Sequence, residues 1–275
     1  VAGLTGLKAG TPVAGGCMDI HASAMAVGIT DEEKMCVVAG TWSINEYISK
    51  KPVVDKDLFM TSIYTMPGYW MILEGSPTSA SNLEWFLAEI LKDVNLGDKD
   101  IYEYSNKCVD GIGDQDCGVV FLPFLFGSNV NINAKGAFIG LQSWHTRENL
   151  LRAVYEGIVF CHKYHIEKLL KFRDQPKMIR MAGGVAKSEI WVQMFADILQ
   201  VPIEVARSQE LGALGSAICA GIATGTFDSF QSASESMVDI MYTAEPNPEK
   251  FAEYDKKYAR YKKVIEALDP IWDEY

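Results

Sequence analysis

The sequence lacks several patterns that would place it in a common class. Its six cysteines are scattered and form no Cys-x-x-Cys pair, which favours buried thiols in a reducing compartment over a disulfide scaffold. Basic residues are in deficit, with 25 Lys and Arg against 36 Asp and Glu and a formal net charge of −11. This balance argues against a nucleic-acid partner, which would require a basic face.

Long apolar runs are also missing. No stretch approaches the ~20 apolar residues of a membrane-spanning helix, and no signal-peptide pattern opens the chain. We therefore expect a cytoplasmic protein without a membrane partner. No strand is followed by Gly-x-Gly-x-x-Gly, which weighs against a dinucleotide-binding oxidoreductase. The chain begins Val-Ala-Gly rather than with Met, so we expect it to be part of a longer protein.

What is present indicates a globular α/β fold. The chain has 275 residues, 48% of them hydrophobic, enough for a sizeable core. Apolar runs and alternation predict strands over 11–16, 35–39, 43–49, one or two within 59–73, and 119–123, 178–181 and 202–206. Helical periodicity predicts helices over 19–27, 79–92, 98–108, 146–173, 190–199, 211–225, 227–237 and 248–275. This order predicts a mixed sheet flanked by helices.

The most informative stretch is 177–199, which has the pattern of a strand, a glycine turn and a helix. Gly183 and Gly184 allow close approach of a ligand because they have no Cβ. Ser188 is placed to cap the helix, and Glu189 already occupies the positive end of its dipole. Adenine or ribose is therefore a better candidate ligand here than phosphate. The alternative is an ordinary turn in which the glycines only reverse the chain.

Asp19 lies in the segment GGCMDIHASA, after a glycine pair and near a helix start. A carboxylate at this place is suited to take a proton from a substrate hydroxyl that attacks phosphorus. The alternative is a helix N-cap, which Asp commonly provides. His21 follows two residues later, and either binds a substrate hydroxyl or is a polar residue satisfied near the helix start.

Gly40 and Thr41 join two predicted strands. Backbone N–H groups and a hydroxyl in such a turn are suited to hold phosphate, and the alternative is a simple hairpin turn. His162 and His165 share a helix face, but no third ligand of metal spacing is nearby, so the sequence gives no support for a zinc site.

One segment carries a more specific pattern. Gly136-x-Phe138-x-Gly140-Leu141 is followed, after seven residues, by Asn149-Leu150-x-x-Ala153-Val154-Tyr155-Glu156. This pattern resembles the second signature of the FGGY family of carbohydrate kinases. The segment 179–191 resembles the adenosine loop of that family, 211–225 its small-residue helix, and GGCMDIHASA its catalytic-aspartate segment. Gly40-Thr41 matches its phosphate-contacting turn, although Trp42 stands where many members have Ser.

The resemblance implies a fold and a domain arrangement. FGGY kinases have two ribonuclease H-like domains, with nucleotide bound mainly on the C-terminal one and sugar in the cleft between them. The resemblance therefore implies that residues 1–275 are the C-terminal nucleotide-binding domain. Residues 1–30 would contribute the catalytic-aspartate segment at the cleft. No first phosphate loop of the Asp-x-Gly-Thr type is found, so the sugar-binding domain is expected to be missing.

The resemblance also implies roles for individual residues. Asp19 would deprotonate the sugar hydroxyl, and His21 would contact the sugar. Gly40 and Thr41 would touch the β- and γ-phosphates of ATP. The adenosine would be bound by Ala80, Glu84, Gly183, Gly184 and Ser188, with Gly212 and Ala213 on the other wall; some members have Asn at position 188. Mg²⁺ would be held mainly by phosphates and water, as its preference for octahedral oxygen ligands suggests.

Within the family, the phrases GTWSINEY and EGSPTSASNLEWF are most similar to those of kinases for L-xylulose and 3-keto-L-gulonate. The predicted partners are thus a small sugar, the missing N-terminal domain and, if the unpaired face self-associates, a second copy of the chain. A non-catalytic nucleotide-binding module of the same superfamily is the alternative. In either case the isolated chain is expected to bind nucleotide and to transfer almost no phosphate to sugar.

Overall fold

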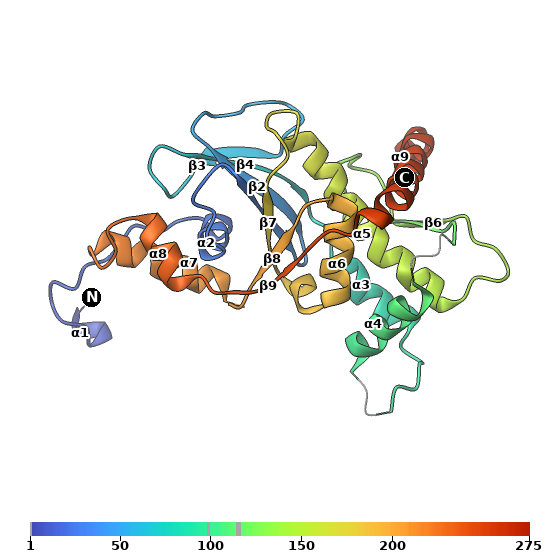
Figure 1. Ribbon diagram of the computed structural model, residues 1–275, viewed down its shortest axis with the longest axis horizontal. Coiled ribbons are helices and arrows are strands. Elements are labelled where there is room, and N and C mark those ends of the chain that lie inside the picture. The colour runs from blue at the N-terminus through green and yellow to red at the C-terminus, as the bar shows by residue number, and fades with distance from the viewer. Residues whose placement is uncertain (1, 98–99, 114–116, 209) are drawn as a thin grey trace.

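A seven-stranded mixed sheet forms the centre of the computed structural model, which describes residues 2–97, 100–113, 117–208 and 210–275 (Figure 1). The spatial order is β3-β4-β2-β1-β7-β8-β9. The central pairs β1–β7 and β7–β8 are parallel, and the outer pairs are antiparallel. The strands are β1 (Lys34–Ala39), β2 (Ser43–Ser49), β3 (Met60–Ile63), β4 (Trp70–Ser76), β7 (Met178–Ala182), β8 (Ile203–Ala206) and β9 (Ile240–Ala244). This arrangement confirms the predicted α/β fold with a mixed sheet.

Helices cover both faces of the sheet (Figure 1). One layer contains α2 (Asp19–Ala26), α7 (Leu211–Ala223) and α8 (Phe230–Met237). The other contains α3 (Ser81–Trp85), α5 (Arg147–Leu169), α6 (Glu189–Leu199) and, farther out, α4 (Ile101–Ile112) and α9 (Phe251–Leu268). Short helical segments are α1 (Ala2–Thr5), η1 (Phe86–Ile90), η2 (Gly184–Lys187), η3 (Pro248–Lys250) and η4 (Asp269–Glu274).

The sheet separates two hydrophobic cores. Along β1, Met35, Val37 and Ala39 pack in the core under α5 and α6, whereas Cys36 packs in the core under α2 and α7. Successive side chains of a strand point to opposite faces, so a strand buried on both faces is apolar throughout, as β1 is after its first residue, Lys34. The same alternation places Ile72 on one side and Met71 on the other.

Helix α5 supports the layer that contains α6. Its 23 residues span ~35 Å, and residues 151–162 are all buried. A second small sheet, β5 (Val120–Leu122) with β6 (Ala137–Ile139), packs beside it. Gly157 permits this contact, since a Cβ there would lie 2.4 Å from the carbonyl oxygen of Phe121. None of the described helices is both long enough and apolar enough to cross a membrane.

Most predicted elements are confirmed, and several differ. The expected strand over 11–16 is wrong: residues 11–18 have no regular structure and are mostly exposed. An apolar run forms a strand only when it pairs with another strand, and no described strand pairs with residues 11–16. The expected helix 79–92 is divided into α3 and the π-helical η1, and β9 was not expected. Positions 98 and 99 of the expected helix 98–108 lie outside the described residues.

Backbone contact fixes α2 against α7. A Cβ added at Gly215 of α7 would lie 1.9 Å from the carbonyl oxygen of Ala22 in α2. This oxygen belongs to the backbone, so the clash can be relieved only by separating the two helices. The position of α2, which begins at Asp19, therefore depends on a glycine in α7.

We expect Gly215→Ala to destabilise the chain by roughly 1–3 kcal/mol or more, because a methyl group has no space there. Gly212→Ala is the matched control on the same helix, where an added Cβ meets nothing within 4 Å. That control should be neutral or stabilising by up to about 1 kcal/mol, since Ala is the better helix former. Urea unfolding measures both, and equal stabilities for the two variants would contradict the close contact.

Candidate functional site

Two turns meet at the ends of the parallel strands β1 and β7. Gly183, directly after β7, has a φ of 93°, a conformation that L side chains rarely adopt. A Cβ there would lie 2.7 Å from the carbonyl oxygen of Ala39 and 3.0 Å from the amide nitrogen of Gly40. Only glycine lets the turn after β7 rest against the turn after β1. The predicted residues Gly183 and Gly40 are thus neighbours.

The hairpin turn at Gly40 and Thr41 is tied to the start of α3. The Ala80 amide donates a hydrogen bond to the Gly40 carbonyl at 2.8 Å, and the Ser81 hydroxyl donates to the Thr41 carbonyl at 3.1 Å. The residue Thr41 itself is exposed. The turn therefore has a fixed backbone and presents an exposed hydroxyl residue next to Gly183.

A cavity of about 560 Å³ opens beside these turns. Four of the predicted adenosine-binding residues line it together: Ala80, Glu84, Gly184 and Ser188. The other lining residues are Leu83, Asp100, Tyr102, Glu103, Asn106, Tyr155, Lys187 and Trp191. Its lining combines three aromatic side chains with six polar or charged ones, and sites for flat organic ligands likewise pair aromatic walls with polar groups.

Ser188 has a double role in this cavity. Its hydroxyl oxygen accepts a hydrogen bond from the Trp191 amide at 3.3 Å, which caps α6 as predicted. The same hydroxyl donates to Asn106 Oδ1 at 2.8 Å, and the Tyr155 hydroxyl donates to that oxygen at 3.0 Å. Three segments, α4, α5 and the start of α6, are thereby fixed around one wall.

A second cavity of about 420 Å³ lies on the other side of η2. Gly183 and Gly184 line it, together with Glu210 and Leu211 at the start of α7. A Cβ at Gly184 would meet nothing within 4 Å, so the η2 turn borders open space. The expected wall residues Gly212 and Ala213 follow Leu211, but of the described residues only Leu211 represents α7 in this lining. Ala213 is exposed, and its role stays a prediction.

Asp19 is the first residue of α2, and its side chain is exposed. The N-cap position belongs to Met18, and no side-chain cap hydrogen bond is made. Asp19 Oδ1 accepts from the amide of the next residue, Ile20, at 2.8 Å. The structure thus leaves this carboxylate accessible at the positive end of a helix.

His21 is buried and already has a partner. Its side chain is 4% exposed, its Nε2 lies 2.9 Å from the Ser62 hydroxyl, and its ring contacts the Tyr64 ring edge-on. Burial lowers the pKa of His21, although the nearby Asp19 charge opposes that shift. The structure gives His21 a packed position, and its contact with sugar stays a prediction.

His162 and His165 bind other side chains. His162 Nδ1 lies 2.8 Å from Asn45 Oδ1, and its Nε2 lies 2.9 Å from the Ser79 hydroxyl. Burial lowers its pKa to about 3, so the ring is neutral. Ser79, which contacts His162, directly precedes Ala80, and the Ala80 amide binds the Gly40 carbonyl. His162 therefore supports the Gly40 turn indirectly. Within the described part of the chain, no group of three His, Cys, Asp or Glu residues is arranged to hold a metal.

Eight of the twelve lining residues were not expected in the site, among them Trp191, Tyr155 and Asn106. Trp191 is only 3% exposed, yet it stacks on Tyr155 with ring centroids 4.3 Å apart and borders the cavity. Tyr155 lies within the 149–156 signature, which could have indicated it. Asn106 could not be predicted as a site residue from the sequence, because its position depends on how α4 packs against α6.

Comparison with known proteins identifies the fold. The model of the FGGY family of carbohydrate kinases, C-terminal domain, matches residues 35–224. The chain belongs to this family. It is 37% identical over 268 residues to a probable L-xylulose kinase of Pasteurella multocida, covering 96% of this chain and 52% of that protein. It is 36% identical over 269 residues to the L-xylulose/3-keto-L-gulonate kinase of Escherichia coli, covering 97% and 52%.

A solved structure agrees with this assignment. The xylulose kinase of Rhodospirillum rubrum superposes with a TM-score of 0.89 at 26% identity, covering 99% of this chain and 55% of that one. The ribonuclease H-like fold and the FGGY resemblance are confirmed. The chain spans about half the length of these relatives.

A buried carboxyl group lies beneath α2 of this FGGY chain. Glu46 on β2 is fully buried and faces Cys36 across the β1–β2 ladder. Burial raises the pKa of Glu46 to about 8; the facing Cys36 thiol opposes the rise, and the Asp19 charge adds to it. A folded pKa above the ordinary value of 4.5 means that the folded chain holds this proton more tightly than the unfolded one.

The free energy of unfolding should therefore fall as pH rises from about 4.5 to about 8, by at most ~1.4 kcal/mol per pH unit from this group. Glu46→Gln should remove that slope. The free energy of unfolding of the variant, relative to that of the wild type, should therefore increase between pH 4.5 and about 8 and stay constant above that range. The exposed Glu266→Gln is the control and should keep the wild-type profile. Denaturant melts at several pH values test this, and parallel profiles for Glu46→Gln and wild type would contradict a neutral Glu46.

Proposed function

We propose that residues 1–275 form the nucleotide-binding half of an ATP-dependent sugar kinase, with Asp19 as the general base. The observation that supports this most is the meeting of two glycine turns at a cavity. Gly183 touches Gly40, and Ala80, Glu84, Gly184 and Ser188 line one space of about 560 Å³. These residues come from distant parts of the sequence, and the family resemblance implies a nucleotide contact for each of them.

In this proposal, adenosine lies against η2, where Gly184 presents backbone without a side chain. Tyr155 and Trp191 stiffen the wall by stacking on each other. The phosphates extend toward Gly40 and Thr41, whose backbone is fixed by α3. Mg²⁺, which neutralises charge on the phosphates, would be held mainly by phosphate oxygens and water.

Asp19 would accept the proton of the sugar hydroxyl as that hydroxyl attacks the γ-phosphate. Its carboxylate is exposed and its helix is fixed against α7 by Gly215, so it would act from a rigid support. Phosphoryl transfer depends chiefly on positioning the hydroxyl, the base and the γ-phosphate in line. The sugar itself would be held between this domain and a second one, in the half of the relatives' length that this chain does not span.

The names of two relatives guide the choice of substrate. L-Xylulose and 3-keto-L-gulonate are the substrates named for the two relatives above, so a ketose or keto-acid is the proposed acceptor. We also propose a cytoplasmic location. We further propose that the isolated chain self-associates through the face that a second domain would cover.

Nucleotide binding is tested by Gly184→Leu. The variant should fold normally, because a Cβ there meets nothing within 4 Å, and should lose ADP binding, because the side chain fills the adenosine space. Gly111→Leu is the matched control: it also has open space around it and lines neither cavity. Calorimetry with ADP compares the three proteins. Equal affinity for wild type and Gly184→Leu would refute this nucleotide site.

Catalysis is tested by Asp19→Asn in a protein that joins this chain to a sugar-binding domain. ADP and sugar should bind almost as before, and turnover should fall by ~10²–10⁴, the usual contribution of a general base. A coupled ADP-release assay with L-xylulose, 3-keto-L-gulonate and D-xylulose measures it. Turnover near normal would assign Asp19 a structural role and favour the alternative, a non-catalytic nucleotide-binding module.

A further inference from the structure

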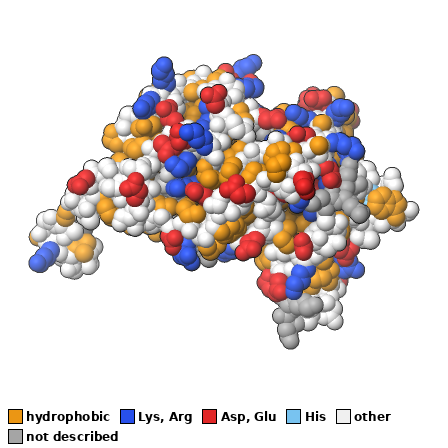
Figure 2. Space-filling view, in the orientation of Figure 1, with side chains coloured by type: hydrophobic (Ala, Val, Ile, Leu, Met, Phe, Trp, Pro, Cys, Tyr) orange, Lys and Arg blue, Asp and Glu red, His pale blue; other side chains and the backbone are white. Residues whose placement is uncertain are grey.

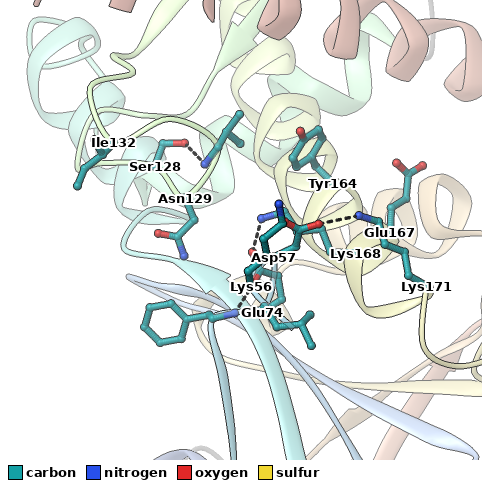
Figure 3. A pocket seen from close by; sticks show the side chains of 13 residues that line it. Lys56, Asp57, Glu74, Ser128, Asn129, Ile132, Tyr164, Glu167, Lys168 and Lys171 are labelled. Carbon is teal, nitrogen blue, oxygen red and sulfur yellow. Dashed lines mark hydrogen bonds and ion pairs between the residues drawn. The ribbon is translucent and has the colours of Figure 1, made fainter. Parts of the chain in front are cut away.

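The charged groups of the largest described cavity are matched by one another. This cavity, of about 760 Å³, is bounded by residues 56–59, Glu74 of β4, residues 128–132 and the C-terminal part of α5 (Figure 3). Its lining has three lysines and three carboxylates, and two of the lysines already pair with two of the carboxylates. Acidic and basic side chains are likewise interspersed on the face of the molecule drawn in Figure 2. Selective recognition of a ligand needs instead a polar atom that lines a cavity and has no partner in the protein.

Asn106 on α4 has such an atom. Its side chain lines the cavity of about 560 Å³ that also contains the predicted adenosine contacts. Its Oδ1 accepts hydrogen bonds from the Ser188 hydroxyl at 2.8 Å and from the Tyr155 hydroxyl at 3.0 Å. No described residue accepts a hydrogen bond from its Nδ2. The amide nitrogen carries two donors, so the cavity wall has N–H groups available at this point.

The two hydroxyls fix the orientation of the Asn106 amide. The Ser188 hydroxyl oxygen accepts from the Trp191 amide at 3.3 Å, which leaves its proton for Asn106. Burial raises the pKa of Tyr155, so its phenol keeps its proton and donates it to the same oxygen. Both hydroxyls therefore need an acceptor. The amide oxygen faces them, and the amide nitrogen is the part left to face a ligand.

The neighbouring donors on this wall are already used. A serine or tyrosine hydroxyl has one proton, and those of Ser188 and Tyr155 go to Asn106. The Trp191 indole N–H donates to the Tyr155 carbonyl at 3.3 Å. Of these four side chains, Asn106 is thus the one that can still donate to a ligand. Ser188 can only accept a further hydrogen bond without losing one that it makes now.

We infer that Asn106 recognises the base of the nucleotide, with Nδ2 donating a hydrogen bond to a ring nitrogen of adenine. The inference deepens the proposed function and rests on it, because it requires adenosine in this cavity. Adenine suits the wall: its flat ring can lie beside the aromatic side chains of Tyr155 and Trp191, and its unprotonated ring nitrogens are acceptors. Because its two partners already hold the amide in place, little conformational entropy is lost when it binds.

The test removes the donor and keeps the acceptor. Asn106→Asp retains an oxygen for both hydroxyls but has no N–H, because an aspartate is ionised at neutral pH. Adenosine is the probe, since it carries no phosphate that the added charge would repel. Its affinity, measured by amide NMR titration, should fall about tenfold. Asn95→Asp is the matched control: Asn95 is exposed and lines neither cavity beside η2, so this variant should bind adenosine like wild type.

Deaza analogues separate base recognition from a structural role. In 1-, 3- and 7-deazaadenosine, one ring nitrogen is replaced by a C–H group. The wild type should bind one of the three about three- to tenfold more weakly than adenosine. In Asn106→Asp that difference should disappear, because the donor that reads the nitrogen is gone. A purely structural Asn106 would instead lower the affinity for adenosine and for all three analogues by the same factor.

Three results would overturn the inference. The first is unchanged adenosine affinity in Asn106→Asp. The second is equal affinity of the wild type for adenosine and all three analogues, a comparison that needs no variant to fold. The third is the absence of adenosine and ADP binding by the wild type, which would also refute the proposed function. ADP binding that is lost in Gly184→Leu, together with equal affinities for the analogues, would refute the role of Asn106 alone.

Discussion

The candidate site depends on one backbone contact, the approach of Gly183 to Ala39 and Gly40. Parallel pairing of β1 and β7 brings the ends of both strands to one edge of the sheet, but proximity of the ends alone does not join their turns. The contact also needs a residue without Cβ in a left-handed conformation, and Gly183 meets both conditions. Because of this contact, the exposed hairpin turn and the cavity-lining turn occupy fixed positions relative to each other.

Two buried histidines of α5, His162 and His165, differ in charge although they lie close in sequence. His162 and His165 are on one turn of α5, yet burial lowers the pKa of the first to about 3 and the neighbours of the second raise its pKa to about 9. The difference follows from their partners. His162 meets neutral groups, Asn45, Ser43 and Ser79, whereas His165 meets the Glu74 carboxylate. A neutral ring therefore supports the hairpin turn, and a charged one is paired with the Glu74 carboxylate.

Local sequence patterns predicted much of this fold and part of the site. Strand–glycine–helix order identified Gly183, Gly184 and Ser188, because each requirement there is local: no Cβ, or a capping hydroxyl. The prediction of a strand at 11–16 is wrong because strand formation also requires a pairing partner, and no described strand pairs with these residues. The edge strand β9 was missed, since its residues are only partly buried and lack clear alternation. Asn106 could not be predicted, because tertiary packing of α4 alone brings it to Ser188.

The division of the interior by the sheet has a consequence for how this domain tolerates sequence change. Residues that pack under α2 and α7 belong to one core, and those under α5 and α6 belong to the other. Effects of substitutions at separated sites without shared partners are close to additive. The layer that carries Asp19 can therefore accumulate repacking substitutions without altering the shape of the cavity on the opposite face. The two layers can diverge at different rates, provided that the glycines joining α2 to α7 and β7 to β1 are retained.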